Sequence, residues 1–184
     1  MNTTWLVILA IVVIAIVVGV IVFMQRRRSE NLRKQFGPEY KRTVDQYGDQ
    51  RKAEAELAAR EERVRKLEIR ALAAEEQSRF GDAWKKTQAR FVDEPSQAVD
   101  EADGLVKEVM QARGYPVGDF EQRAANISVD HPNVVTNYRA ARDIALRNRS
   151  GKATTEDLRQ TMVYYRSLFE ELLAQSTTPR EAVR

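Results

Sequence analysis

The residues with the clearest capacity for chemistry gather in the longest irregular region that the sequence predicts, around positions 115–132. His131 is the only histidine, and beside Asp130 it could serve as a general base or as a pH-dependent contact. Binding residues concentrate on loops that a rigid scaffold holds in place. If the chain has a binding site, we therefore expect it here, with five polar members: Tyr115, Asp119, Asp130, His131 and Arg139.

The same residue types also have structural explanations, and we favour these. Asp119 is followed three residues later by Gln122, which is the spacing of a helix capping box. His131 stands directly before Pro132, where a chain commonly turns. We therefore expect helix capping and turn formation to account for most of the irregular region.

Several kinds of catalytic and cofactor chemistry have no residues to draw on. Cysteine is absent, which excludes thiolate nucleophiles, thiolate metal ligands and disulfides. A single histidine cannot supply a multi-histidine metal site. The eight glycines are scattered and form no phosphate-binding motif. We expect no cofactor, no bound metal and no enzymatic activity.

Positive charge is concentrated in one short stretch. Residues 25–42 contain seven basic and two acidic side chains, whereas the rest of the chain carries slightly more acidic than basic residues. A nucleic-acid-binding domain spreads its basic residues over a folded face. The sequence therefore predicts no nucleic-acid partner, and it points to contact between the basic stretch and a membrane.

A run of twenty apolar residues, positions 5–24, precedes the basic stretch, and fifteen of them are Leu, Ile, Val or Phe. A helix of this length spans roughly 30 Å, which is the thickness of a bilayer core. A cleaved signal peptide and a buried core helix are the alternatives. The run is longer than a signal peptide's apolar segment and lacks a small-residue cleavage site after it. We predict a retained transmembrane helix.

The flanking residues predict how this helix is oriented. Basic residues beside a span stay on the cytoplasmic side, and here they are Arg26, Arg27 and Arg28. Residues 1–4 would then form a short extracytoplasmic N-terminus, with Trp5 at the outer interface. The same basic cluster would contact anionic lipid headgroups. Ala15 and Gly19 form a small-xxx-small pair that would let a second copy approach, giving a homodimer.

The remaining chain predicts helices only, so the fold class is all-α. We expect a basic juxtamembrane segment over residues 25–37 that ends at a Gly-Pro break, and a long, charged stalk helix over residues 38–72. The stalk would either form a coiled coil with a second copy or pack back on the domain. A small cytoplasmic helical bundle should follow over residues 73–174, centred on the apolar helix that begins at Pro95, and residues 175–184 should be a disordered tail.

Three segments carry a family resemblance: residues 36–40 (FGPEY), residues 113–124 (RGYPVGDFEQRA) and residues 155–160 (TEDLRQ). They resemble a family of uncharacterised bacterial single-pass membrane-anchored proteins with a helical C-terminal domain. The resemblance covers nearly the whole chain and implies a location in the bacterial cytoplasmic membrane. It implies no activity and no functional residue.

Together these features predict a membrane-tethered, non-enzymatic interaction module that presents a helical domain to a protein partner at the cytoplasmic face. Two alternatives stay open. The chain could be an accessory or regulatory subunit of an envelope or transport complex. It could also be a small hydrolase that uses Asp130 and His131.

Overall fold

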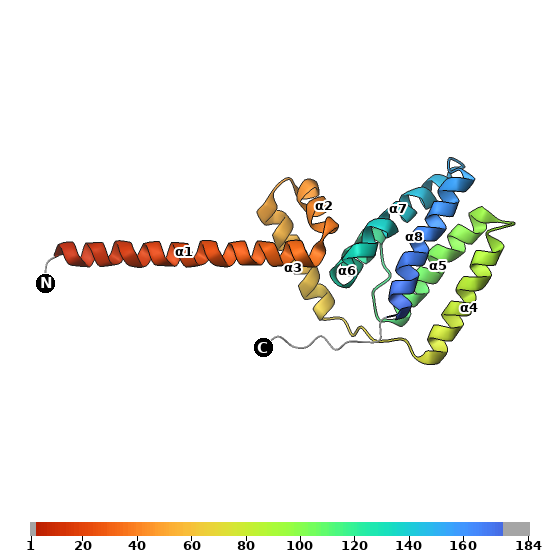
Figure 1. The fold of residues 1–184 in the computed structure, drawn as a ribbon, viewed down its shortest axis with the longest axis horizontal. Helices are drawn as coiled ribbons and strands as arrows, with labels where there is room; N and C mark the ends of the chain where they lie inside the picture. The colour runs from red at the N-terminus through yellow and green to blue at the C-terminus, as the bar shows by residue number, and fades with distance from the viewer. Residues whose placement is uncertain (1–2, 175–184) are drawn as a thin grey trace. The chain divides into compact units, whose positions relative to one another are not determined.

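The computed structural model describes the backbone of residues 3–174 and the side chains of residue 9 and residues 11–174. Eight helices and no strands occur in the described backbone, which confirms the all-α prediction (Figure 1). The chain divides into two compact units, Met1–Ala58 and Ala59–Arg184. The two units are described separately below.

The first unit begins with the longest helix, α1 (Thr3–Phe36). It ends where Gly37 adopts a positive φ of 47°, and Pro38 then opens α2 (Pro38–Tyr47). Glycine tolerates this backbone conformation, and proline is suited to the first turn of a helix because its missing amide would have no partner there. The predicted Gly-Pro break is confirmed.

The apolar half of α1 has no buried face. Every residue from Ile11 to Met24 is exposed, so apolar side chains point outward on all sides of the helix. Within the described part of the chain, no helix has both the length and the apolar character that crossing a membrane requires. The side chains of residues 5–8 and 10 of the predicted span lie outside the described ones.

The prediction of one stalk helix over residues 38–72 is wrong. The structure has two helices there, α2 and α3 (Gln50–Arg65), and no helix over residues 66–73. Gly48 ends α2 in the left-handed conformation, with a φ of 64° and its amide bonded to the Val44 carbonyl. Asp49 then caps α3, because its Oδ1 accepts from the Lys52 amide at 2.9 Å.

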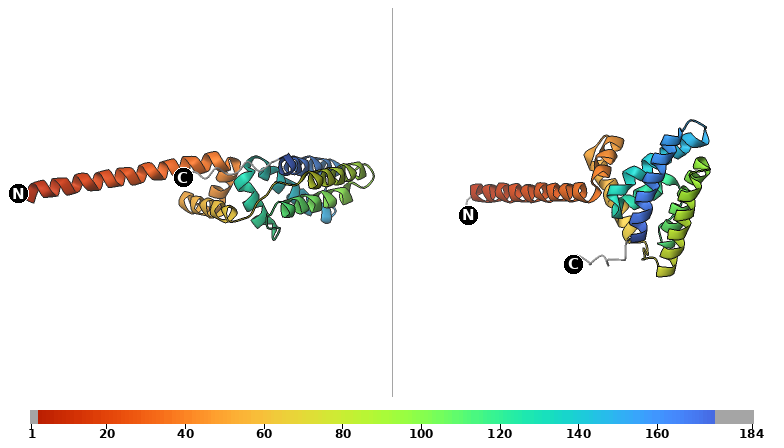
Figure 2. Two further views of the ribbon diagram at one scale, coloured as in Figure 1. Left: turned by 90° about the horizontal axis from the view of Figure 1, so that it is seen from below. Right: turned by 45° about the vertical axis from the view of Figure 1, so that its right-hand side comes forward.

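The second unit consists of one half of α3 and five further helices. These are α4 (Ala74–Arg90), α5 (Pro95–Ala112), α6 (Phe120–Asp130), α7 (Pro132–Arg149) and α8 (Thr155–Ala174). The views in Figures 1 and 2 agree that α8 lies between α5 and α7, with α4 on the outer side of α5. The small bundle expected after residue 73 is therefore present in this unit; the predicted tail, residues 175–184, lies outside the described residues.

Helix α5 buries a continuous apolar face in the core, as its sequence predicts, but it shares the middle of the bundle with α8, which packs against both α5 and α7. Val99, Ala102, Val106, Val109 and Met110 are fully buried along one face of α5. Aromatic side chains from α4, α7 and α8 complete the core, and the rings of Trp84 and Phe169 stack at a centroid distance of 4.7 Å. Burying each large apolar side chain contributes about 1.5–3 kcal/mol, so this continuous core is what holds the bundle together.

A close backbone approach fixes the segment between α3 and α4. The Arg70 amide donates to the Arg113 carbonyl at 2.9 Å, and the Arg113 guanidinium donates to the carbonyls of Arg70 and Leu172 at 3.2 and 2.9 Å. Gly114 follows with a φ of 94°. A Cβ at this position would lie 2.4 Å from the Glu68 carbonyl oxygen, so only glycine fits.

Candidate functional sites

Three of the five predicted loop residues lie together in the second unit. The Tyr115 hydroxyl donates to Asp130 Oδ2 at 2.7 Å, and the Tyr115 ring lies 6.4 Å from the His131 ring. Tyr115 and His131 are both buried. Tyr115 comes from the connection after α5, and Asp130 and His131 come from the junction between α6 and α7. Packing of the bundle brings these two segments side by side.

His131 is a buried junction residue whose imidazole is held by α8. The residue is only 2% exposed, and its Nδ1 lies 3.4 Å from Glu171 Oε1. Its Nε2 is buried without a hydrogen-bond partner among the described residues. Burial lowers the pKa of His131, and this outweighs the opposite effect of Glu171 and Asp130. The imidazole is therefore held neutral at pH 7.

The other two predicted residues lie in separate contacts. Asp119 caps α6, since its Oδ1 accepts from the Gln122 amide at 3.0 Å. The second hydrogen bond of a capping box, from the Asp119 amide to the Gln122 side chain, is not formed among the described residues, and Gln122 Nε2 donates to Asn126 Oδ1 at 3.0 Å. Arg139 on α7 donates to Glu121 Oε2 at 2.6 Å. The structure thus brings together Tyr115, Asp130 and His131 and gives Asp119 and Arg139 structural roles elsewhere.

Asp103 forms a buried polar cluster that the sequence does not reveal. This residue of α5 is 1% exposed, and its carboxylate accepts from Tyr165 on α8 at 3.2 Å and from Lys107 at 2.6 Å. Arg142 on α7 lies 3.9 Å away. Burial together with the Asp103 charge raises the pKa of Tyr165 well above its usual range. The cluster links three helices of the core. Its members could not be recognised together in the sequence, because the partners of Asp103 lie four to sixty-two residues away from it.

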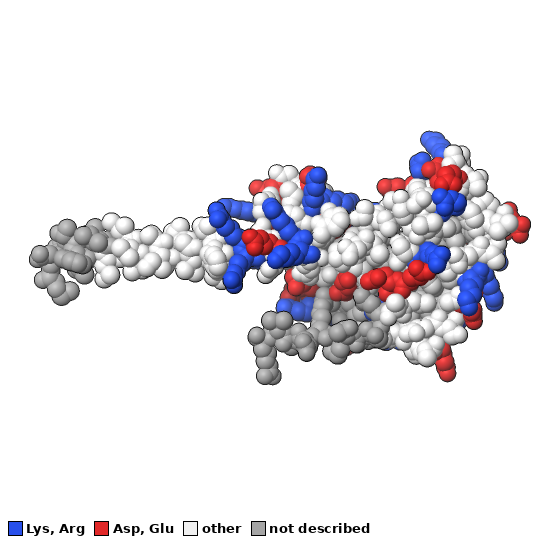
Figure 3. Space-filling model, viewed as in Figure 1, with Lys and Arg blue, Asp and Glu red and all other residues white. Residues whose placement is uncertain are grey.

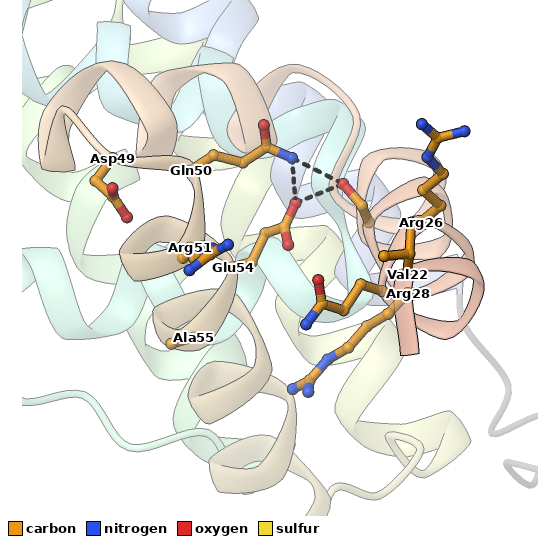
Figure 4. A pocket seen from close by; sticks show the side chains of 10 residues that line it. Val22, Arg26, Arg28, Asp49, Gln50, Arg51, Glu54 and Ala55 are labelled. Carbon is orange, nitrogen blue, oxygen red and sulfur yellow. Dashed lines mark hydrogen bonds between the residues drawn. The ribbon is translucent and has the colours of Figure 1, made fainter. Parts of the chain in front are cut away.

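A second candidate site is a hollow in the first unit, between α1 and the start of α3. Its volume is about 670 Å³, and Figure 4 shows the side chains around it. The lining residues are Val22, Gln25, Arg26, Arg28, Ser29, Asp49, Gln50, Arg51, Glu54 and Ala55. Two of these residues are apolar, Val22 on α1 and Ala55 on α3, and the others are polar or charged, with three arginines and two carboxylates.

Hydrogen bonds at the hollow join all three helices of the first unit. Glu54 Oε1 on α3 accepts from Ser29 on α1 at 2.5 Å, from Tyr40 on α2 at 2.6 Å and from Gln50 at 2.9 Å. Burial would raise the pKa of Glu54, but these three hydrogen bonds outweigh it and leave the pKa below its usual value. Glu54 is thus an ionised carboxylate whose charge is already well satisfied.

The arginines of the hollow have no such partners. Neither a hydrogen bond nor an ion pair engages Arg26, Arg28 or Arg51 within the described part of the chain. Figure 4 shows Arg28 extending from α1 toward α3, whereas Arg26 points away from α3. Lys and Arg side chains gather where the uncharged surface of α1 ends (Figure 3). The third arginine of the predicted basic cluster, Arg27, lies over the Phe23 ring at 4.9 Å.

The sequence predicts the basic cluster but not the hollow. The predicted stalk helix over residues 38–72 includes Gln50, Arg51 and Glu54. A continuous helix there runs away from α1, so the sequence did not predict that these three residues lie beside it. Gly48 followed by Asp49 was the available signal, because it combines a helix stop with a helix cap. That turn allows the start of α3 to lie beside α1.

The remaining predicted anchor residues lie along α1. Ala15 and Gly19 are exposed and, four residues apart, share one side of the helix. A Cβ at Gly19 would meet no neighbouring atom within 4 Å. The side chain of Trp5 lies outside the described ones. Among the described residues, no group of three or more His, Asp or Glu side chains could hold a metal ion.

No protein-family model, no curated protein and no solved structure matches this chain. The resemblance to bacterial membrane-anchored proteins therefore stays a prediction.

Proposed function

We propose that the chain is a membrane-tethered, non-enzymatic interaction module of the bacterial cytoplasmic membrane. Its N-terminus would lie outside, residues 5–24 would span the bilayer, and the helical bundle would be presented to a protein partner at the cytoplasmic face. The observation that carries this proposal is the surface of α1, which is apolar on all sides from Ile11 to Met24. A helix of this kind is stable when lipid or protein surrounds it.

The energetics of the twenty-residue apolar run support a spanning position. Each Leu, Ile, Val or Phe contributes about −0.3 to −0.6 kcal/mol to insertion, and fifteen of them give a total on the order of −5 kcal/mol after the ends are discounted. The basic residues from Arg26 onward favour a cytoplasmic location for everything that follows. Each basic side chain near the surface adds about 1 kcal/mol of attraction to anionic lipid.

The hydrolase alternative gains no support from the position of His131. A general base must come within hydrogen-bond reach of its substrate. The His131 side chain is buried, and its Nδ1 already faces Glu171. We therefore do not propose it.

The orientation can be tested cleanly because the chain contains no cysteine. Single cysteines would replace Asn2 and the exposed Gln111, and intact cells would be treated with a membrane-impermeant maleimide. We expect Asn2→Cys to be labelled in intact cells and Gln111→Cys only after the membrane is opened. Labelling of Gln111→Cys in intact cells would contradict the proposed orientation.

The interaction role can be tested with the same cysteine-free background. A photoreactive maleimide would be attached to cysteines at three exposed positions on different helices of the bundle, Lys86, Leu146 and Val163, in isolated membranes. An interaction module should give one discrete protein adduct from some positions and none from the others. If all three positions give no adduct, or the same diffuse mixture, the bundle does not have a specific binding surface.

A further inference from the structure

The hollow between α1 and α3 would lie at the level of the lipid headgroups. Val22 belongs to the predicted span, and Gln25 to Ser29 follow it directly on the same helix. At about 1.5 Å per residue, the distance from Met24 to Ser29 is roughly 7 Å along the helix axis. The headgroup layer on each side of a bilayer is about 5–7 Å thick. The polar residues that α1 contributes to the hollow therefore match the headgroup layer, and Val22 matches the start of the acyl chains.

The charges in the hollow fit an anion. Its two carboxylates already accept hydrogen bonds from the protein, Asp49 from the Lys52 amide and Glu54 from three side chains, and the three arginines outnumber them. Arg28 and Arg51 come from the two helices that enclose the hollow and have no partner within the described chain. A guanidinium group can bind two phosphate oxygens with two parallel hydrogen bonds. Two arginines therefore recognise a phosphate group by geometry as well as by charge.

Folding of the first unit places the backbone of Arg28 and that of Arg51 on the two helices beside the hollow before any ligand arrives. Ser29, Tyr40, Gln50 and Glu54 link α1, α2 and α3, and this network fixes the start of α3 beside α1. Arg51 directly follows Gln50, which this network fixes. The backbone of Arg51 is therefore held near α1, although Arg51 follows Arg28 by twenty-three residues in the sequence. A site whose backbone is folded in advance loses less entropy on binding than a flexible basic tail.

We propose that this hollow binds the phosphate group of an anionic phospholipid, with Arg28 and Arg51 as its two main ligands and Gln25 as an additional donor. The acyl chains of the lipid would lie against α1 at Val22. This inference rests on the proposed membrane anchorage, and it goes further by assigning a specific lipid site where the sequence indicates only a diffuse cationic surface.

The test compares two double variants of the full chain in detergent. Arg28→Gln with Arg51→Gln removes the two phosphate ligands. Arg27→Gln with Lys52→Gln removes the same charge from the neighbouring positions on the same two helices, neither of which lines the hollow. Binding of phosphatidylglycerol and of phosphatidylcholine would be measured by native mass spectrometry, with and without millimolar inorganic phosphate.

We expect the unaltered chain and the control variant to retain one phosphatidylglycerol molecule more tightly than phosphatidylcholine. In the Arg28 and Arg51 variant, phosphatidylglycerol should bind about tenfold more weakly or worse. Equal weakening in both variants would overturn the proposal in favour of diffuse attraction. Equal binding of the two lipids would also overturn it, and so would displacement of the lipid by inorganic phosphate, which would make free phosphate the ligand.

These outcomes are separate from failure of the membrane anchor. If the chain does not remain in membranes, the proposed function fails whatever happens in detergent. If the chain remains in membranes but the Arg28 and Arg51 variant binds phosphatidylglycerol normally, only the lipid site is wrong.

Discussion

At the scale of single residues, His131 shows how a residue with catalytic potential can serve a structural role. It closes α6, precedes the first residue of α7 and faces Glu171 on α8. Its place at a turn before Pro132 could be predicted from the sequence, since that signal is local. Its burial and its contact with Glu171, forty residues away, could not, because they depend on how α8 packs against α7.

The buried imidazole predicts a pH-dependent stability. The pKa of His131 is lowered in the folded chain from its usual value of about 6.5. Below about pH 6.5, histidine in the unfolded chain takes up a proton, whereas the buried imidazole of the folded chain resists protonation. The stability linked to neutral His131 is complete above that pH and is lost as the pH falls toward the lower folded pKa. Groups that face the imidazole, Glu171, Asp130 and Arg113, modulate this loss.

Replacing His131 with Gln removes the titration and leaves a similar volume. We expect His131→Gln to cost about 1–2 kcal/mol near neutral pH, because a packed contact with Glu171 is lost. Its melting temperature should then fall less than that of the unaltered chain on acidification toward about pH 5.5. Thermal melts followed by circular dichroism at both pH values would measure this. The same acid-induced decrease in both proteins would contradict the assignment.

At the scale of helices, the sequence predicts where helices begin and end better than it predicts whether a helical stretch is unbroken. Pro38, Pro95 and Pro132 open α2, α5 and α7, and Asp119 caps α6 where its spacing predicts. Thr154 and Asp157 exchange hydrogen bonds at the start of α8. The stalk prediction was wrong because the charged composition of residues 38–72 favours a helix at nearly every position, and the short Gly48-Asp49 turn looked like an irregularity in one helix.

The glycines at helix ends provide a matched comparison within the bundle. Gly114 and Gly151 both have positive φ, of 94° and 68°, but a Cβ would clash with the Glu68 carbonyl only at Gly114. Gly151→Ala should cost about 1 kcal/mol for the left-handed backbone alone. Gly114→Ala should cost roughly 3 kcal/mol or more, since the chain must also shift at Glu68.

Chemical denaturation of the two variants would give both free energies. The segment between α3 and α4 should also become more accessible to protease in Gly114→Ala. Equal destabilisation of the two variants would mean that the close approach of Gly114 to Glu68 does not contribute to stability.

At the scale of the whole molecule, an apolar helix, a cationic stretch and a charged helical bundle follow one another along the chain. The apolar run and the basic cluster could be identified from the sequence, because both are continuous stretches of residues. The hollow between α1 and α3 could not, because it forms only when the turn at Gly48 places Arg51 beside the helix that carries Arg28. Proximity of distant residues depends on packing, which no local pattern encodes.

The most direct measurement is extraction of cell membranes at alkaline pH, which releases proteins that are not embedded in the bilayer. The unaltered chain should stay in the membrane pellet. Ile14→Arg with Val18→Arg should move it to the supernatant, because two central arginines cost about 5–7 kcal/mol and offset the insertion free energy. Ala89→Arg with Gln111→Arg, on exposed bundle positions, should leave it in the pellet. Release of the unaltered chain into the supernatant would contradict the account.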